Sequence, residues 1–538
     1  MKKTVLISIL IVSLTACNKP EFVNNILPNP KKIETTHKIL HFRNDVNFVV
    51  VENNENYDKL TNYLSELFSC LNCSVSNSIN EKCTNIILKI DNNLSTEAYN
   101  LKVDKKDITI SGGDFRGIFW GIQTLRQFLP LNVLNFKPWE IEIPQMEISD
   151  YPDFQYRGMH LDVCRHFFSV EEVKTYIDLL ILHKFNTFHF HLTDDQGWRI
   201  EIKALPKLTE IGSQRKETLI KKNWGTYDGI LYGGFFTQDE IREIVKYAEE
   251  RFITVIPEIE MPGHALAALA AYPELGCKGE NYETGTYWGV FDDVFCAGND
   301  KTFKFLETVI DEVCELFPNS PYIHVGGDEC PKICWKKCAK CQQRIKENNL
   351  KNEAELQSYF VQRMEKYINS KGKQIIGWDE ILEGGIAANA TIMSWQGETG
   401  GIIAARQKHN VIMTPNPVCY FDHYQSENKD AEPFAFGGFS NCEKILSWNP
   451  IPDSLSENEK KYIIGVQANL WSEYILNFKQ AEYMVLPRMA ALSEIAWNNS
   501  EKMSYSEFNK RIKFFAQRYD ALNYYYAKHE MQNEIEKK

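Results

Sequence analysis

From Arg157 onward the sequence alternates short apolar segments with amphipathic stretches, and this alternation is the strongest constraint on the fold. The expected strands are residues 158–163, 187–192, 253–259, 322–325, 374–378, 391–395, 411–414 and 465–470. The expected helices include residues 170–183, 237–251, 301–316 and 353–370. Eight strands with helices between most of them, within about 320 residues, predict a (β/α)8 barrel with insertions over residues 151–500. A doubly wound open sheet is the alternative, but no glycine-rich phosphate loop follows the first strand.

A smaller unit precedes the barrel. Residues 31–150 alternate short apolar runs with helical patterns at residues 57–68 and 115–128, which predicts a small α+β domain. Two prolines between residues 141 and 153 mark the connector to the barrel. Residues 501–538 are expected to form a C-terminal helical segment. The predicted fold class is therefore α/β, a TIM barrel preceded by a small α+β domain.

The N-terminus has the pattern of an export signal. Two lysines precede an apolar run at residues 5–14, which is too short for a permanent membrane-spanning helix. The sequence Leu-Thr-Ala-Cys that ends at Cys17 resembles a bacterial lipobox, whose cysteine is lipidated and becomes the mature N-terminus. We therefore expect a signal peptide at residues 1–16, a lipidated Cys17 and a tether at residues 17–30. The protein would be exported and held by more than one acyl chain on a bacterial membrane, facing the periplasm or the cell surface. An ordinary cleaved signal with a chance cysteine is the alternative.

The charge balance limits the possible partners. The chain carries 72 acidic and 60 basic residues, and its net charge of -12 disfavours binding to phosphate backbones or to anionic lipid surfaces. We therefore expect no nucleic-acid partner.

The 14 cysteines of an exported chain favour disulfides. Cys277 and Cys296 flank a loop rich in Gly, Tyr and Trp and are the first candidate pair. A second group consists of Cys330, Cys334, Cys338 and Cys341. Thiolates at such spacings can converge on zinc, but no matching second cluster follows, which favours a staple between loop and helix or free thiols. We expect neither a metal nor a cofactor.

Polar and aromatic residues follow the ends of the predicted barrel strands. In a (β/α)8 barrel these ends face one shared pocket. The residues at or just past them are Arg165, Asp194, Asp195, Glu258, His264, Asp328, Glu329, Trp378, Trp395, Tyr420, Asp422, Trp471 and Glu473. Helix capping explains some of these residues, but it does not explain so many carboxylates and tryptophans together.

The adjacent carboxylates of Asp328 and Glu329 point to cleavage of a glycosidic bond. This reaction needs an acid for the leaving oxygen and a group that stabilises positive charge at the anomeric carbon. Neighbouring carboxylates raise each other's proton affinity, so one can stay protonated while the other is ionised. The longer side chain suits the acid, and Gly326 and Gly327 allow the backbone close to a ligand. A helix cap would explain Asp328 alone.

The run from His324 to Glu329 closely resembles the signature of family 20 glycoside hydrolases, the β-N-acetylhexosaminidases. The resemblance extends, in the family's order, over about residues 152–500. The other matching segments are residues 157–166, 189–199, 257–264, 377–380, 394–397, 420–422 and 470–473.

The resemblance implies substrate-assisted catalysis, in which the substrate's own 2-acetamido oxygen attacks the anomeric carbon and forms an oxazolinium intermediate. Asp328 would hold the acetamido N–H and stabilise the developing positive charge, and Tyr420 would hydrogen-bond the acetamido oxygen. Glu329 would protonate the leaving group and then deprotonate water, so that the configuration is retained. The expected partner is a glycan with a terminal 2-acetamido sugar.

The same resemblance implies a pocket walled by Trp378, Trp395 and Trp471 around the acetamido methyl and the sugar ring. A pocket closed by Trp471 suggests exo action on terminal β-linked N-acetylglucosamine or N-acetylgalactosamine. The loops at residues 212–234 and 276–297 would decide between these sugars and select the natural glycan.

Charged residues would complete the sugar site. Arg165, Asp422 and Glu473 would bind the hydroxyls of the terminal sugar through charge-assisted hydrogen bonds. Asp194 and His264 match the family's polar support around the acid. For these two residues a structural hydrogen bond and a direct catalytic contact are both open.

Two other classes of function remain as alternatives. A metal-dependent amidohydrolase would use His189 and His191 with His264 as a third ligand. In such enzymes the His-x-His pair usually ends the first barrel strand, whereas here it lies on the second. A catalytically silent glycan-binding lipoprotein is the other alternative, but the three expected catalytic residues are all present.

Overall fold

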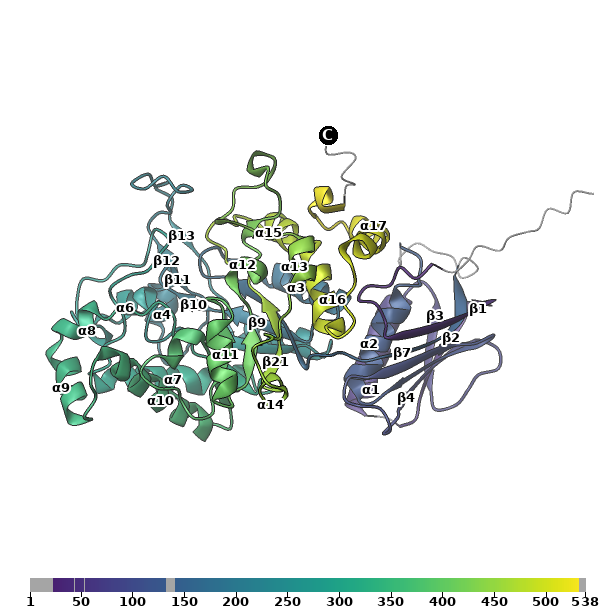
Figure 1. Cartoon of the computed structure of the whole chain (residues 1–538), viewed down its shortest axis with the longest axis horizontal. Coiled ribbons are helices and arrows are strands. Elements are labelled where there is room, and N and C mark those ends of the chain that lie inside the picture. The colour runs from purple at the N-terminus through teal and green to yellow at the C-terminus, as the bar shows by residue number, and fades with distance from the viewer. Residues whose placement is uncertain (1–22, 43, 53, 132–140, 532–538) are drawn as a thin grey trace, which may run out of the picture.

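The computed structural model describes residues 23–42, 44–52, 54–131 and 141–531, arranged as a small sheet domain beside a barrel (Figure 1). The predicted lipidation site Cys17 and the signal peptide lie outside the described residues. Within these ranges no helix has the length and apolar character needed to cross a membrane.

The N-terminal domain is a mixed sheet of seven strands in the order β1-β7-β5-β6-β4-β2-β3. Its strands are β1 (Lys32–His41), β2 (Asp45–Val50), β3 (Asn72–Ser76), β4 (Thr84–Ile90), β5 (Tyr99–Val103), β6 (Asp107–Gly112) and β7 (Glu142–Asp150). The helices are α1 (Glu55–Leu67) and α2 (Phe115–Arg126). Their N-cap residues are Asn54 and Asp114, whose side chains accept hydrogen bonds from backbone N–H groups of the first turn. Helix α2 lies between the sheet and the barrel, and most of its residues are buried because it packs on both.

The second domain is a closed barrel of eight parallel strands, which confirms the predicted fold class. Its strands are β8 (Tyr156–Asp162), β9 (Thr187–His191), β14 (Thr254–Glu258), β15 (Tyr322–His324), β16 (Gln374–Trp378), β17 (Thr391–Ser394), β18 (Val411–Met413) and β21 (Ile463–Ala468). Pairing of β21 with β8 closes the barrel. The longer helices of this domain are α3 (Val170–Leu182), α5 (Gln238–Glu249), α7 (Asp300–Leu316), α10 (Glu353–Ser370), α16 (Arg488–Asn498) and α17 (Tyr505–Ala521). Each predicted strand matches one barrel strand because a strand buried on both faces is a short, continuous apolar run.

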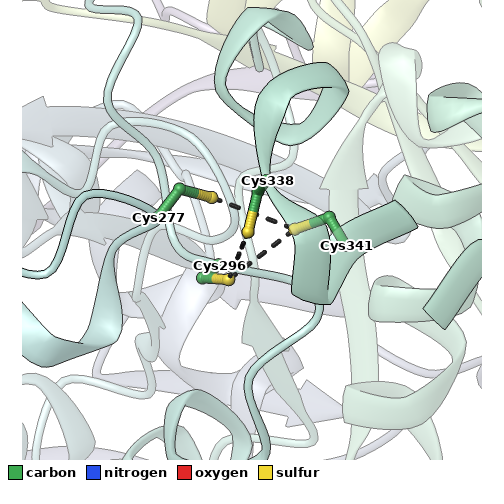
Figure 2. A group of neighbouring side chains, drawn as sticks. All are labelled: Cys277, Cys296, Cys338 and Cys341. Atoms are coloured by element: carbon green, nitrogen blue, oxygen red, sulfur yellow. Dashed lines mark hydrogen bonds between the residues drawn. The ribbon is translucent and has the colours of Figure 1, made fainter. Parts of the chain in front are cut away.

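The cysteines differ from expectation. No disulfide joins Cys277 to Cys296. Both thiols instead meet those of Cys338 and Cys341 (Figure 2). Cys330 and Cys334 do not join this group. The two ends of the loop between Cys277 and Cys296 meet only the start of α9 (Ala339–Glu347), which carries Cys338 and Cys341. The expected pair is therefore not a disulfide. Of the expected group of four, only Cys338 and Cys341 join the cluster, and all four are free thiols, which is one of the two states expected for them.

The two domains are joined by a buried ion pair between Arg157 at the start of β8 and Glu97 of the N-terminal domain. The guanidinium lies over the rings of both Trp120 and Trp497. Burial opposes the charge on Glu97, but Arg157 and Arg116 outweigh it and keep the pKa of this carboxyl below its usual value. Trp120 Nε1 donates to the same carboxylate at 2.8 Å. The pair is therefore ionised and hydrogen-bonded on both sides.

Replacing Glu97 by Gln should leave the Arg157 charge buried without a counter-ion. We expect the free energy of unfolding, measured by urea denaturation, to fall by about 3–5 kcal/mol. Glu243→Gln breaks the exposed contact with Lys174 and should cost less than about 1 kcal/mol. Equal effects of the two substitutions would contradict the importance of the buried pair.

Candidate functional site

A pocket of about 510 Å³ opens where the barrel strands end. Most of the predicted site residues line it. They are Arg165, His264, Asp328, Glu329, Trp395, Tyr420, Asp422, Trp471 and Glu473. The other four, Asp194, Asp195, Glu258 and Trp378, are buried behind this lining.

The turn after β15 places the two adjacent carboxylates. Gly326 and Gly327 have φ values of 63° and 94°, in the left-handed region that favours glycine. A Cβ at Gly326 would clash with the carboxylate of Glu260. Glu329 also has a positive φ, of 43°, which is uncommon for a residue with a side chain. The glycine pair therefore turns the chain sharply, and the following two side chains line the pocket.

A buried carboxylate, Glu258, organises the barrel interior beneath the pocket. Its oxygens contact His189 at 3.0 Å, His324 Nδ1 at 2.8 Å and the ring of His191, and accept the Nε1 proton of Trp378 at 2.9 Å. We call these five residues the Glu258 cluster. Burial opposes ionisation of Glu258, but the histidines, His324 first, hold its pKa well below the usual value. The cluster fixes Trp378 beneath the residues that line the pocket.

This arrangement does not assemble the site expected for an amidohydrolase. His189 and His191 turn to Glu258 inside the barrel, where no part of either ring is exposed. His264 lines the pocket instead and pairs with Asp195 at 2.9 Å. The three predicted ligands therefore do not face one position.

Asp194 connects the Glu258 cluster to the pocket. Its Oδ2 atom accepts from His191 Nε2 at 2.9 Å and from Arg165 at 2.8 Å, and its Oδ1 lies 3.4 Å from His264 Nδ1. Burial disfavours the charge of His264, but Asp194 and Asp195 outweigh this effect and raise its pKa well above the usual value. His264 is thus a buried cation, and Asp194 supports it without lining the pocket.

His264 contacts both members of the carboxylate pair. Its Nε2 atom lies 3.5 Å from Glu329 Oε2 and 3.6 Å from Asp328 Oδ2. Burial raises the pKa of Asp328 to about 7, although His264 opposes this shift. The contact with His264 lowers the pKa of Glu329, whose side chain is 39% exposed. As the pH falls, Asp328 therefore takes up a proton before Glu329, which is the reverse of the order expected from sequence.

Three buried carboxylates of the pocket lining carry an oxygen without a hydrogen-bond partner among the described residues. These atoms are Asp328 Oδ1, Asp422 Oδ1 and Glu473 Oε2. Burial raises the pKa of Asp422 and, to about 7, that of Glu473. Buried polar atoms are nearly always paired, so these oxygens fit a ligand that brings several hydroxyl or amide donors.

Aromatic rings form the wall between these carboxylates. Tyr420 stacks on Trp395 with ring centroids 5.9 Å apart and packs against Trp471 at 6.3 Å. Burial raises the pKa of Tyr420 well above its usual value, so its hydroxyl remains a donor. Trp395 Nε1 donates to Glu380 at 2.8 Å, and burial raises the pKa of this carboxyl to about 9. Glu380 was not predicted as a site residue, although it ends one of the matching sequence segments.

The rim of the pocket comes from loops that the strand pattern does not place. Lys222 and Trp224 belong to one of the two loops expected to select the glycan, and Trp288 and Val290 belong to the other. Further lining residues are Gly289, Asn416, Phe436 and Tyr474. Their only sequence signal is the local enrichment in Gly, Tyr and Trp.

Comparison with known proteins places both domains in one family. Residues 154–500 match the model of the catalytic domain of glycosyl hydrolase family 20, and residues 23–151 match the model of its domain 2. A β-hexosaminidase of Porphyromonas gingivalis is 49% identical over 437 residues, which are 80% of this chain and 55% of the relative. A β-hexosaminidase of Vibrio furnissii is 37% identical over 413 residues, 76% of this chain and 66% of the relative. The chain thus spans between about half and two thirds of the length of these relatives.

Solved structures show the same likeness. A family 20 exo-β-N-acetylglucosaminidase of Vibrio harveyi, in complex with N-acetylglucosamine, has a TM-score of 0.81 at 32% identity. The match covers 94% of this chain and 78% of the Vibrio harveyi chain. The β-N-acetylhexosaminidase of Bacteroides fragilis has a TM-score of 0.81 at 31% identity, and the match covers 94% of this chain and 98% of the Bacteroides fragilis chain. Together, the barrel, the pocket and these matches show that the chain belongs to glycosyl hydrolase family 20.

Proposed function

We propose that this protein is an exo-acting β-N-acetylhexosaminidase that removes terminal β-linked N-acetylglucosamine or N-acetylgalactosamine with retention of configuration. The observation that carries the proposal is the adjacent pair Asp328 and Glu329 in a pocket with Tyr420. Relatives named β-hexosaminidase and a similar structure holding N-acetylglucosamine support it.

The pocket geometry supports a nucleophile carried by the substrate. Asp328 Oδ1 lacks a donor and would accept the acetamido N–H, which orients the acetamido oxygen towards the anomeric carbon. Tyr420 would donate to that oxygen. As the C–O bond to the leaving group breaks, the acetamido oxygen closes an oxazolinium ring, and Asp328 stabilises its positive charge. Glu329 gives its proton to the leaving oxygen and later takes one from the water that opens the ring.

Substrate binding would reverse the order in which the pair is protonated. A hydrogen bond from the acetamido N–H stabilises the ionised form of Asp328 and lowers its pKa from about 7. The sugar also removes solvent from the half-exposed Glu329, and the neighbouring charge on Asp328 then raises the proton affinity of Glu329. Glu329 thus becomes the protonated member of the pair in the complex, although its pKa is the lower of the two before the sugar binds.

Groups that would bind the hydroxyls of a single terminal sugar support exo action. Arg165 is held by Asp162 at 3.2 Å and by Asp194 at 2.8 Å, and its guanidinium lies over Trp471. The unpartnered oxygens of Asp422 and Glu473 would accept sugar hydroxyls there. A sugar whose hydroxyls are engaged in this way would be the last residue of its chain.

The first prediction concerns the acid. Glu329→Gln removes the proton donor, so kcat/KM for N-acetylhexosaminides with poor leaving groups should fall by about 10²–10⁴-fold. Aryl glycosides with acidic leaving groups need less protonation and should lose much less. The exposed Glu315→Gln serves as the control and should behave as the wild type. Equal losses on both kinds of substrate, or a wild type that binds the sugars without turnover, would contradict the proposal.

The second prediction concerns pH. Cleavage needs one proton on the carboxylate pair, which Asp328 holds in the free enzyme with a pKa of about 7 and which Glu329 carries in the complex. The value of kcat/KM should therefore decline about tenfold per pH unit as the pH rises above about 7, because kcat/KM reports groups of the free enzyme. This limb near pH 7 should disappear from the residual activity of Asp328→Asn on activated aryl substrates, because Glu329, whose pKa is lowered, then sets the proton content of the pair. A profile that keeps the limb near pH 7 in this variant would assign it to another group.

We also propose that the protein is exported and anchored to a bacterial membrane through lipid on Cys17. The support is the sequence alone, in which an apolar run ends at Leu-Thr-Ala-Cys. Cys17→Ala should shift the full-length protein from the detergent phase to the aqueous phase in detergent partitioning. Unchanged partitioning would contradict the lipid anchor. Cys70→Ala, in the N-terminal domain, is the control.

A further inference from the structure

Four cysteine thiols from two separate segments meet beside the barrel (Figure 2). Cys277 and Cys296 stand at the two ends of the loop that precedes α7. Cys338 and Cys341 belong to the start of α9 (Ala339–Glu347), spaced as Cys-x-x-Cys. We call this group the four-thiol cluster. Cys296 and Cys341 are buried, whereas Cys277 and Cys338 are half-buried.

The separations between the sulfur atoms have the dimensions of a tetrathiolate site. The Sγ atom of Cys296 lies 3.6 Å from that of Cys341 and 3.7 Å from that of Cys338, and Cys277 lies 3.9 Å from Cys341. A disulfide needs a bond of about 2.05 Å. Zinc binds thiolate sulfur at about 2.3 Å, so the edge of a regular tetrahedron of sulfurs around it is about 3.8 Å.

We propose that Cys277, Cys296, Cys338 and Cys341 bind one structural Zn²⁺ ion. Each thiol would release its proton to solvent as its Zn–S bond forms, with no change of oxidation state. Four protein ligands leave no open position for water, which is typical of a structural rather than a catalytic zinc. The site itself does not depend on the activity proposed above.

The backbone around the four-thiol cluster favours thiolates. The Gly298 N–H hydrogen-bonds to Cys296, in a Cys-x-Gly turn. A Cβ on Gly298 would clash with the backbone of Lys340 and Cys341, so this glycine lets the two segments approach each other. Cys338 is the N-cap residue of α9, where the positive end of the helix dipole stabilises a negative sulfur.

The proposed zinc would fix one wall of the substrate pocket. The loop between Cys277 and Cys296 carries Trp288 and Val290, which line the pocket. Next to Cys296, Phe295 N donates to Pro262 O at 3.0 Å, two residues before His264, and Phe295 O accepts from Trp335 at 2.9 Å. The other pair of ligands lies in the segment that continues from Glu329. A metal that joins these segments holds the rim loop against the catalytic turn.

The metal content of the purified full-length protein tests the site directly. We expect about one zinc per chain, released when a mercurial reagent titrates the thiols. Protein produced with cobalt should show the thiolate-to-metal charge-transfer absorption of a tetrahedral Co²⁺ centre. Zinc-free protein would overturn the proposal, whether its thiols remain reactive or its intact mass reveals the loss of hydrogen to two disulfides.

Variants of the half-buried Cys277 give the sharpest comparison. Cys277→Ser should lose zinc to a competing chelator at least about tenfold faster than the wild type, whereas Cys277→His supplies a nitrogen ligand and should retain it better. Cys334→Ser is the matched control, because this nearby thiol donates to Asp293 at 3.4 Å instead. Equal zinc loss from the wild type, Cys277→Ser and Cys334→Ser would contradict the assignment. The wild-type metal content remains decisive if a variant fails to fold.

Discussion

The carboxylate of Glu258 is the charge on which the rest of the site depends. No part of its side chain is exposed, and it remains ionised because three histidines and the indole of Trp378 surround it. From Glu258 the contacts continue through His191 to Asp194, and from there to Arg165 and His264. A buried charge is tolerated only while its partners stay in place, so each side chain in this series has little freedom. The pocket is therefore held from inside the barrel.

This network also explains why the pKa values of the two adjacent carboxyls, Asp328 and Glu329, differ. Asp328 is buried and faces other carboxylates, while Glu329 reaches solvent and contacts the cation of His264. The two adjacent side chains therefore have pKa values shifted in opposite directions before any ligand binds. A ligand that donates an N–H group to Asp328 favours the ionised form of this carboxyl, so that Glu329 holds the proton of the pair.

The positions of the barrel strands were readable from the sequence. Each of the eight strands contains a short buried run of apolar or aromatic residues because both faces of a barrel strand are covered, and a glycine pair with two carboxylates follows the fourth strand. The resemblance to family 20 named most of the pocket lining. It did not reveal that Trp378 and Asp194 lie behind the lining, because this depends on which way a side chain points at a strand end.

The sequence by itself determined the strand order of the barrel, the identity of the carboxylate pair and the aromatic character of the pocket, because these are local properties of short segments. Tertiary structure decided the rest. The protonation order of Asp328 and Glu329 depends on the distance to His264, which lies more than 60 residues earlier in the chain. The four-thiol cluster combines cysteines that sequence spacing had separated, since Cys277 and Cys296 meet Cys338 and Cys341 only when the loop packs on α9. Charges and thiols act over a few ångströms in space, and only the folded chain fixes which of them are neighbours.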